Sequence, residues 1–156
     1  MRTKYSVSAV IEDNVSIGDG SFVWYFSHIM DNVKIGKNCT IGEKVFIGKN
    51  VMIGDRVKVG NGANICEGAI IKDDVFIGMG ANLTNVRKPL AYKKAEKYLD
   101  TIIEEKVSLG ANTTVVGGTR IGKGAMVADG AVVIGNLPDA VLAVGNPARI
   151  VKRITS

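Results

Sequence analysis

The chain has 156 residues, which is enough for one domain with a sizeable core, and it is 46% hydrophobic but only 6% aromatic. Its net charge of +5 favours an anionic partner, and a phosphorylated small molecule fits better than nucleic acid because the basic residues lack interleaved aromatic side chains. No stretch approaches the roughly 20 apolar residues of a membrane span and the N-terminal residues lack the apolar centre of a signal peptide, so we expect a cytoplasmic protein without a membrane partner.

Aliphatic residues recur at a strict interval of six, which neither the 3.6-residue period of a helix nor the two-residue period of a strand explains. They are Ile11, Ile17, Val23, Ile29, Ile35, Ile41, Ile47, Ile53, Val59, Ile65, Ile71, Ile77 and Leu83. Two positions before each member from Ile17 onward stands a mostly smaller residue, and glycine often follows directly, where the missing Cβ lets the backbone bend. This pattern is the hexapeptide repeat of a parallel β-helix, in which short parallel strands are joined by tight corners.

Three hexapeptides make one triangular coil of eighteen residues, so residues eighteen apart lie one above the other at about 4.8 Å. This map places Glu67 directly below Asn85. It also predicts an outward-facing column: His28, Phe46, Asn64 and Asn82. Cys39 falls in the inward row of small residues and Cys66 on another phase, so we expect two free thiols and no disulfide.

The repeat breaks once, between Leu83 and Ile103, and then continues to Val133. The gap is twenty residues where six would suffice, so fourteen residues leave the coil. We expect an excursion over about residues 86–100, whose Ala, Lys and Glu content would allow a short helix over Leu90–Asp100. Such loops lie on the working face of a solenoid more often than they form neutral bulges.

The last segment, from about residue 135 to 156, does not follow the hexapeptide rule. A solenoid needs its open end covered, so a C-terminal cap is expected there. The sequence therefore predicts one all-β domain over residues 1–156, made of a parallel β-helix, one extruded loop and a short cap.

These features resemble the left-handed β-helix acyltransferases that use acetyl-CoA. More narrowly, four segments resemble the bacterial N-acetyltransferases that act on UDP- or dTDP-linked amino sugars for surface polysaccharide: Phe22–Ile29, Glu67-Gly68, Asp73–Gly78 and Thr84-Asn85. The resemblance covers essentially the whole chain and implies left-handed coils, a homotrimer, acetyl-CoA as co-substrate and no metal. Three departures from these relatives leave the sugar and nucleotide open: Tyr25, Cys66 and Pro89-Leu90.

Acetyl transfer to an amine needs a positioned thioester and a stabilised oxyanion more than a strong base. With the resemblance, Asn85 would orient the acceptor and Glu67 would accept its N–H, while a backbone N–H at Gly117 or Gly118 would bind the oxyanion. The alternatives are a corner cap for Asn85 and a solvated carboxylate for Glu67.

His28 is the only histidine in the sequence, which excludes a γ-type carbonic anhydrase because that enzyme needs three for zinc. It would contact the acceptor, or serve as the base of a sugar O-acetyltransferase. Trp24 offers an aromatic face to a ring, or packs at a trimer interface. Further acceptor contacts are expected from Asn64 and Arg87.

Coenzyme A carries a diphosphate and a ribose phosphate, for which four basic residues are candidates: Arg120, Lys123, Arg149 and Lys152. The sequence thus favours an acetyl-CoA-dependent N-acetyltransferase of a nucleotide-linked amino sugar. Two alternatives stay open, sugar O-acetylation and a non-catalytic β-helix that serves as an assembly or binding module.

Overall fold

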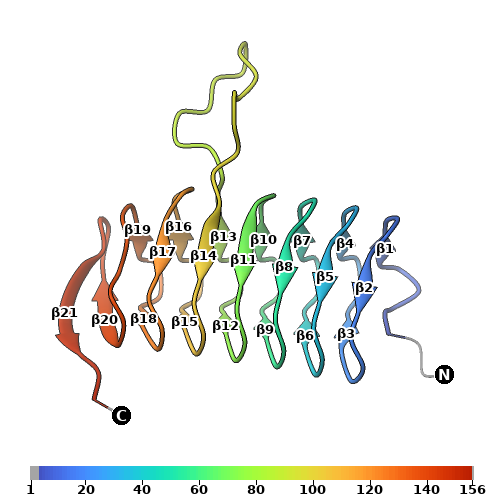
Figure 1. Cartoon of the computed structure of the whole chain (residues 1–156), viewed down its shortest axis with the longest axis horizontal. Coiled ribbons are helices and arrows are strands. Elements are labelled where there is room, and N and C mark those ends of the chain that lie inside the picture. Colours follow the sequence, from blue (N-terminus) through green and yellow to red (C-terminus); the bar gives the residue numbers. More distant parts are fainter. Residues whose placement is uncertain (1–3, 156) are drawn as a thin grey trace.

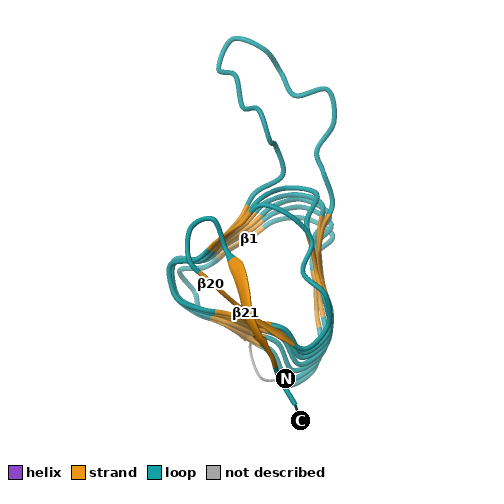
Figure 2. Ribbon diagram, turned by 90° about the vertical axis from the view of Figure 1, so that its left-hand side faces the viewer, coloured by secondary structure: helices purple, strands orange, loops and turns teal. Residues whose placement is uncertain are grey.

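The computed structural model describes residues 4–155, which coil into a triangular prism with one parallel sheet on each side (Figures 1 and 2). Most strands have only two residues, because each coil must turn three corners within eighteen. Within the described residues all strands pair in parallel except the last two, which are antiparallel.

The first sheet has seven strands: β1 (Val10–Ile11), β4 (His28–Ile29), β7 (Phe46–Ile47), β10 (Asn64–Ile65), β13 (Asn82–Leu83), β16 (Thr114–Val115) and β19 (Val132–Val133). The second has six: β2 (Ser16–Ile17), β5 (Lys34–Ile35), β8 (Met52–Ile53), β11 (Ala69–Ile71), β14 (Thr101–Ile103) and β17 (Arg120–Ile121). The third has eight: β3 (Phe22–Val23), β6 (Thr40–Ile41), β9 (Lys58–Val59), β12 (Phe76–Ile77), β15 (Ser108–Leu109), β18 (Met126–Val127), β20 (Val141–Val144) and β21 (Arg149–Arg153).

The strand register confirms the eighteen-residue map. His28 pairs with Phe46, Phe46 with Asn64, and Asn64 with Asn82, so the predicted outward column exists. From β13 to β16 the step grows to 32 residues, because the fourteen extra residues leave the coil between these strands. The sequence therefore predicted both the column and the size of the interruption.

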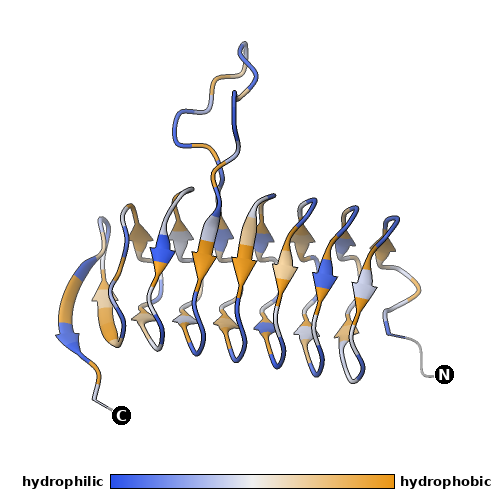
Figure 3. Cartoon of the chain, viewed as in Figure 1, coloured by the Kyte–Doolittle hydropathy of each residue, from blue (hydrophilic) through white to orange (hydrophobic). Residues whose placement is uncertain are grey.

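The inward rows form one continuous core along the prism. Every aliphatic repeat position from Val23 to Val133 is buried, whereas Ile11 and Ile17 are only partly covered because few coils lie beyond them. Cys39 is buried in the row of small residues, and both Cys39 and Cys66 are free, as predicted. Figure 3 shows the same alternation as orange and blue patches along each coil.

The chain leaves the prism between β13 and β14 as a long loop, here called the excursion, residues 86–99 (Figure 1). The short helix that its composition would allow does not form, and its regular structure is limited to a turn closed by a bridge between Leu90 and Lys93. A helix of this length is marginal without docking, and the excursion projects away from the prism.

At the C-terminal end, β20 and β21 form an antiparallel pair, and Figure 2 shows β21 lying across the end of the prism. No helix that could cross a lipid bilayer occurs between Lys4 and Thr155.

Candidate functional site

A hollow of about 280 Å³ lies beside the base of the excursion, at the corner that joins the first sheet to the second. We call it the corner hollow, and its lining residues are Met30, Phe46, Gly48, Lys49, Cys66, Glu67, Asn85 and Tyr98. Two rows cross its floor, each with members eighteen residues apart: the apolar row of Met30, Gly48 and Cys66, and the polar row of Lys49, Glu67 and Asn85. Tyr98 reaches the hollow from the returning limb of the excursion.

Asn85 connects the polar row to the excursion. Its Nδ2 donates to the backbone oxygen of Glu67 at 3.1 Å, and its own backbone oxygen accepts the Leu99 N–H at 2.9 Å. The first bond is the contact expected if Asn85 serves only to cap the corner of the coil. Within residues 4–155, however, Asn85 Oδ1 has no hydrogen-bond partner, so this oxygen remains available to a ligand.

Glu67 lies one coil from Asn85, as the sequence map predicts. Its Oε1 accepts a hydrogen bond from Asn50 Nδ2 at 3.2 Å. Glu67 lines the corner hollow and also a neighbouring hollow of about 380 Å³, and Tyr98 lines both. Glu67 therefore borders two hollows beside the base of the excursion.

Gly117 is fully engaged in holding the base of the excursion. Its N–H donates to Thr84 Oγ1 at 3.0 Å, and its carbonyl accepts from Arg87 Nε at 2.9 Å. Arg87, which was expected to contact the acceptor, therefore also anchors the base of the excursion to the next coil. The Gly117 N–H is not available to an oxyanion in this arrangement.

Gly118 differs from Gly117 in the surroundings of its N–H. At the same corner three coils earlier, the Asn50 N–H donates to the carbonyl of Asp31. The matching carbonyl, on Asn85, is occupied by Leu99 instead. Within the described chain the Gly118 N–H is left without a partner, which makes it the better candidate of the two for an oxyanion contact.

His28 forms a close pair that the sequence interpretation missed. Its Nε2 lies 2.6 Å from Glu12 Oε1, and its ring packs edge-on against Phe46 with centroids 5.8 Å apart. The eighteen-residue map contained the signal, because Val10 pairs with His28 and Glu12 follows two residues later at the corner. Since β4 and β13 are three strand spacings apart, about 14 Å, His28 and Asn85 do not meet within one chain.

Two other predicted acceptor contacts, Trp24 and Asn64, are not among the residues that line the corner hollow. Trp24 follows β3 of the third sheet and packs edge-on against Phe22, with ring centroids 5.0 Å apart. Asn64 donates from Nδ2 to Asn82 Oδ1 at 2.9 Å, which makes a side-chain ladder along the outward column. The structure thus brings Asn85 and Glu67 together. It does not bring Trp24 and His28 to them in a single chain, and Asn64 lies on the strand next to β13 but outside the lining of the hollow.

The basic residues suggested for coenzyme A lie toward the C-terminal end and are exposed. Arg120 Nε is 3.0 Å from Glu104 Oε1, and Lys123 Nζ is 2.7 Å from Glu105 Oε2. The hydrogen bond from Lys123 lowers the pKa of the Glu105 carboxyl. Arg149 bonds the carbonyl of Ala148, and Lys152 is exposed on β21. Exposed ion pairs of this kind contribute little to stability and can exchange for phosphate contacts.

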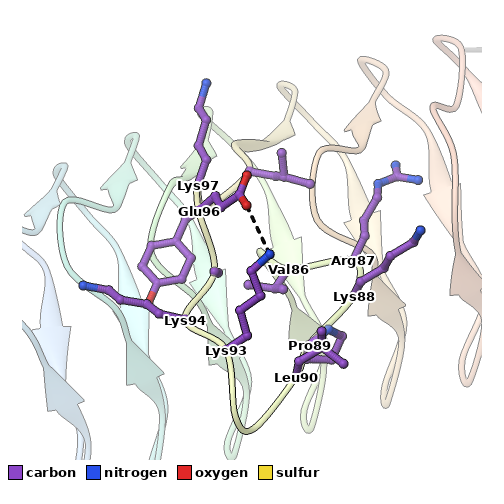
Figure 4. A pocket seen from close by; sticks show the side chains of 12 residues that line it. Val86, Arg87, Lys88, Pro89, Leu90, Lys93, Lys94, Glu96 and Lys97 are labelled. Atoms are coloured by element: carbon purple, nitrogen blue, oxygen red, sulfur yellow. Dashed lines mark ion pairs between the residues drawn. The ribbon is translucent and has the colours of Figure 1, made fainter.

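The excursion lines a further, open hollow of about 660 Å³ between its two limbs (Figure 4). Five of its lining residues are cationic: Arg87, Lys88, Lys93, Lys94 and Lys97. Glu96 is the single carboxylate in the lining and pairs with Lys93 at 3.3 Å, drawn as a dashed line. This positive charge lies next to the corner hollow, because Tyr98 lines both.

Residues 8–49 and 100–135 match the family described as bacterial transferase hexapeptide (six repeats), and residues 32–85 match the hexapeptide repeat of succinyl-transferase. The chain belongs to the hexapeptide-repeat transferase family. This agrees with the resemblance drawn from the sequence.

Among curated proteins, the chain is similar to the 2,3,4,5-tetrahydropyridine-2,6-dicarboxylate N-acetyltransferase of Staphylococcus aureus strain JH9, with 38% identity over 80 residues. That match covers 51% of this chain and 31% of the relative, so the chain matches about a third of the length of these curated relatives.

Among solved structures, the chain resembles the polySia specific acetyltransferase NeuO at 25% identity and a TM-score of 0.69, covering 98% of this chain and 89% of that one. The acetyltransferase domain of PglB from Neisseria gonorrhoeae FA1090, solved with acetyl coenzyme A, shares the fold at 21% identity and a TM-score of 0.64. The match covers 94% of this chain and 56% of that one.

Proposed function

We propose that this protein is an acetyl-CoA-dependent N-acetyltransferase that acts on the amino group of a UDP- or dTDP-linked amino sugar. The observation that carries the proposal is the placement of Asn85 and Glu67 in one hollow, with the unpartnered Gly118 N–H one coil away. An amine needs orientation more than deprotonation, and none of the residues that line this hollow in the described chain is a histidine. The N-acetyltransferase and acetyltransferases to which the chain is similar support acetyl-CoA as the donor.

In the proposed reaction, Asn85 Oδ1 and a Glu67 carboxylate oxygen accept the two N–H bonds of the neutral sugar amine. The nitrogen lone pair then points at the thioester carbonyl and attacks it, and the carbonyl oxygen gains negative charge. The Gly118 N–H donates to that oxygen. As the tetrahedral intermediate collapses, the C–S bond breaks, the nitrogen loses one proton to Glu67, and that proton passes to the thiolate of coenzyme A.

The proposal includes a homotrimer, because two of the remaining candidate residues, His28 and Trp24, are too far away within one chain. His28 lies about 14 Å along the sheet from β13, and Trp24 lies on another side of the prism. A neighbouring chain would supply Trp24 and His28 to the acceptor bound beside Asn85 and Arg87. Asn64, on the strand next to β13, would contact the same acceptor from within the chain. Arg120, Lys123, Arg149 and Lys152 would bind the phosphates of coenzyme A.

A second candidate is O-acetylation of a sugar with His28 as base. The Glu12 carboxylate 2.6 Å from His28 Nε2 favours it, since a carboxylate at this distance holds the imidazole ring in one orientation. In that case the dyad would deprotonate a hydroxyl, and Asn85 would be a corner contact only.

The experiment that tests the proposal is a thiol-release assay with acetyl-CoA across a panel of UDP- and dTDP-linked amino sugars, with the matching sugars that carry a hydroxyl in place of the amine as controls. We expect release only with the amino sugars, together with a rise in melting temperature on adding acetyl-CoA. A cytoplasmic role in surface polysaccharide synthesis is part of the same proposal. No release from any acceptor and no thermal shift would instead favour the non-catalytic module.

A further inference from the structure

Most of the positive charge of the excursion has no part in the proposed reaction. The open hollow between its two limbs, here called the excursion hollow, is lined by five cationic residues: Arg87, Lys88, Lys93, Lys94 and Lys97. Glu96 is the single carboxylate among the lining residues, so five cations and one anion give the hollow a net charge of +4. Like charges on two facing limbs repel one another, and an anion between them would remove that repulsion.

The base of the excursion holds one of these cations in a fixed place. Arg87 Nε donates to the Gly117 carbonyl at 2.9 Å, and the Leu99 N–H ties the returning limb to the Asn85 carbonyl at 2.9 Å. Within residues 4–155 the two Nη groups of Arg87 have no hydrogen-bond partner. A guanidinium anchored in this way presents its remaining N–H groups as a planar fork, which matches two oxygens of a phosphate.

The lysines of the returning limb are free to contact an anion or can easily become so. Lys93 pairs with Glu96 at 3.3 Å, but the two side chains are 61% and 85% exposed, so the pair is weak and can exchange for a phosphate contact. In the part of the chain that the structure describes, Lys94 and Lys97 form no ion pair. An anion in the excursion hollow can therefore draw on cations from both limbs.

The position of the excursion hollow favours a diphosphate over other anions. Tyr98 lines both this hollow and the corner hollow, so the two are neighbours. In a nucleotide sugar the diphosphate is bonded to the anomeric carbon, so a sugar in the corner hollow places its diphosphate beside the sugar ring. A diphosphate has charged oxygens on both phosphorus atoms, which lets it contact the outgoing and the returning limb at once.

We propose that the excursion hollow is a binding site for a diphosphate, with Arg87 as its anchored fork and Lys94 and Lys97 as cations of the returning limb. Two molecules of the proposed reaction carry this group, the nucleotide-linked sugar and coenzyme A, and the neighbouring corner hollow favours the sugar. The link to the sugar rests on the proposed acetyl transfer. Binding of the diphosphate itself does not.

The first test is calorimetric titration of the full chain with inorganic diphosphate, in the absence of acetyl-CoA and sugar. Lys94→Gln/Lys97→Gln removes two cations of the hollow and should raise Kd by about tenfold, whereas Glu96→Gln removes the competing carboxylate and should lower Kd by about threefold. Lys34→Gln/Lys58→Gln is the matched control. It removes the same charge from exposed positions of β5 and β9, outside the hollow, and should keep Kd within about twofold.

A second test distinguishes the two sources of the diphosphate. Lys94 and Lys97 are exposed, so trypsin should cleave after them in the free protein. If the nucleotide sugar supplies the diphosphate, UDP or dTDP should slow this cleavage, while coenzyme A and sodium chloride at equal ionic strength should not. Lys94→Gln/Lys97→Gln should then raise the KM of the acceptor by about tenfold and leave that of acetyl-CoA unchanged. The reverse pattern would keep the site and assign it to coenzyme A.

Melting temperatures establish that each variant is folded. No binding of inorganic diphosphate to the wild-type protein would overturn the proposed site, and so would equal losses of affinity in the two double variants; either result leaves the proposed acetyl transfer intact. Diphosphate binding that depends on Lys94 and Lys97, with no thiol release from any amino sugar, would support the site and overturn the proposed function.

Discussion

Asn85→Ala separates a positioning role from that of a corner contact. The substitution removes the 3.1 Å bond from Nδ2 to the Glu67 carbonyl and the unpartnered Oδ1 that would hold the acceptor amine. The lost partly buried bond should cost about 1 kcal/mol of stability, or a melting temperature lower by about 2–4 °C in a chain of this size. Loss of a positioning contact should lower kcat by about a hundredfold, equivalent to about 2.7 kcal/mol of transition-state stabilisation.

Asn61→Ala is the matched control. Asn61 is also a corner asparagine, whose Oδ1 accepts the Glu43 N–H at 2.8 Å, but it lies at another corner of the prism. The assay measures thiol release at saturating acetyl-CoA beside the melting temperature of each variant. We expect similar melting temperatures and a large loss of turnover for Asn85→Ala alone. If the two variants lose equal stability and both keep wild-type turnover, Asn85 is a corner contact and the mechanism proposed here is wrong.

Three further predictions concern the core, the histidine and the backbone. Ile53 is buried in β8 between Ile35 and Ile71, so Ile53→Ala should lower the free energy of unfolding, measured with denaturant, by about 2–5 kcal/mol. Ile53→Asp should not fold. A soluble Ile53→Asp protein with an unchanged melting temperature would contradict the stacking map. His28→Ala should raise the acceptor KM with little change in kcat, whereas a near-complete loss of kcat would favour O-acetylation by the Glu12–His28 pair. Phe26 has a φ of 59° and is 65% exposed, so Phe26→Asn should raise the melting temperature by relieving up to about 1 kcal/mol of backbone strain. A lower melting temperature in the assembled protein would contradict this prediction and indicate that Phe26 contacts a neighbouring chain.

Most of the fold follows from the spacing of one residue class. Because an inward aliphatic residue is required once in every six, the interval alone predicts the three sheets, the eighteen-residue register and the fourteen extra residues. The contact between Asn85 and Glu67 follows from the same register. The same register could also have predicted Glu12 as the partner of His28, but the sequence interpretation missed this pair.

The path of the excursion could not be derived in this way. The excursion has no repeating pattern, so nothing in its sequence indicates that Tyr98 turns back to line the corner hollow. The sequence also does not indicate that the Leu99 N–H donates a hydrogen bond to the Asn85 carbonyl. The Thr84 hydroxyl occupies the Gly117 N–H, whereas the Gly118 N–H has no partner within residues 4–155, and the sequence interpretation could only name both glycines. The helix considered for this segment was judged on composition, which says nothing of docking.

The most direct test of the account is the chemical form of the transferred acetyl group. The product made from acetyl-CoA and a dTDP- or UDP-linked amino sugar is isolated, and its ¹H–¹³C–¹⁵N correlations and its reaction with hydroxylamine are recorded. We expect the acetyl carbonyl to be bonded to the sugar nitrogen as an amide that hydroxylamine leaves intact. An ester on a sugar oxygen, cleaved by hydroxylamine, would contradict transfer to the amine beside Asn85.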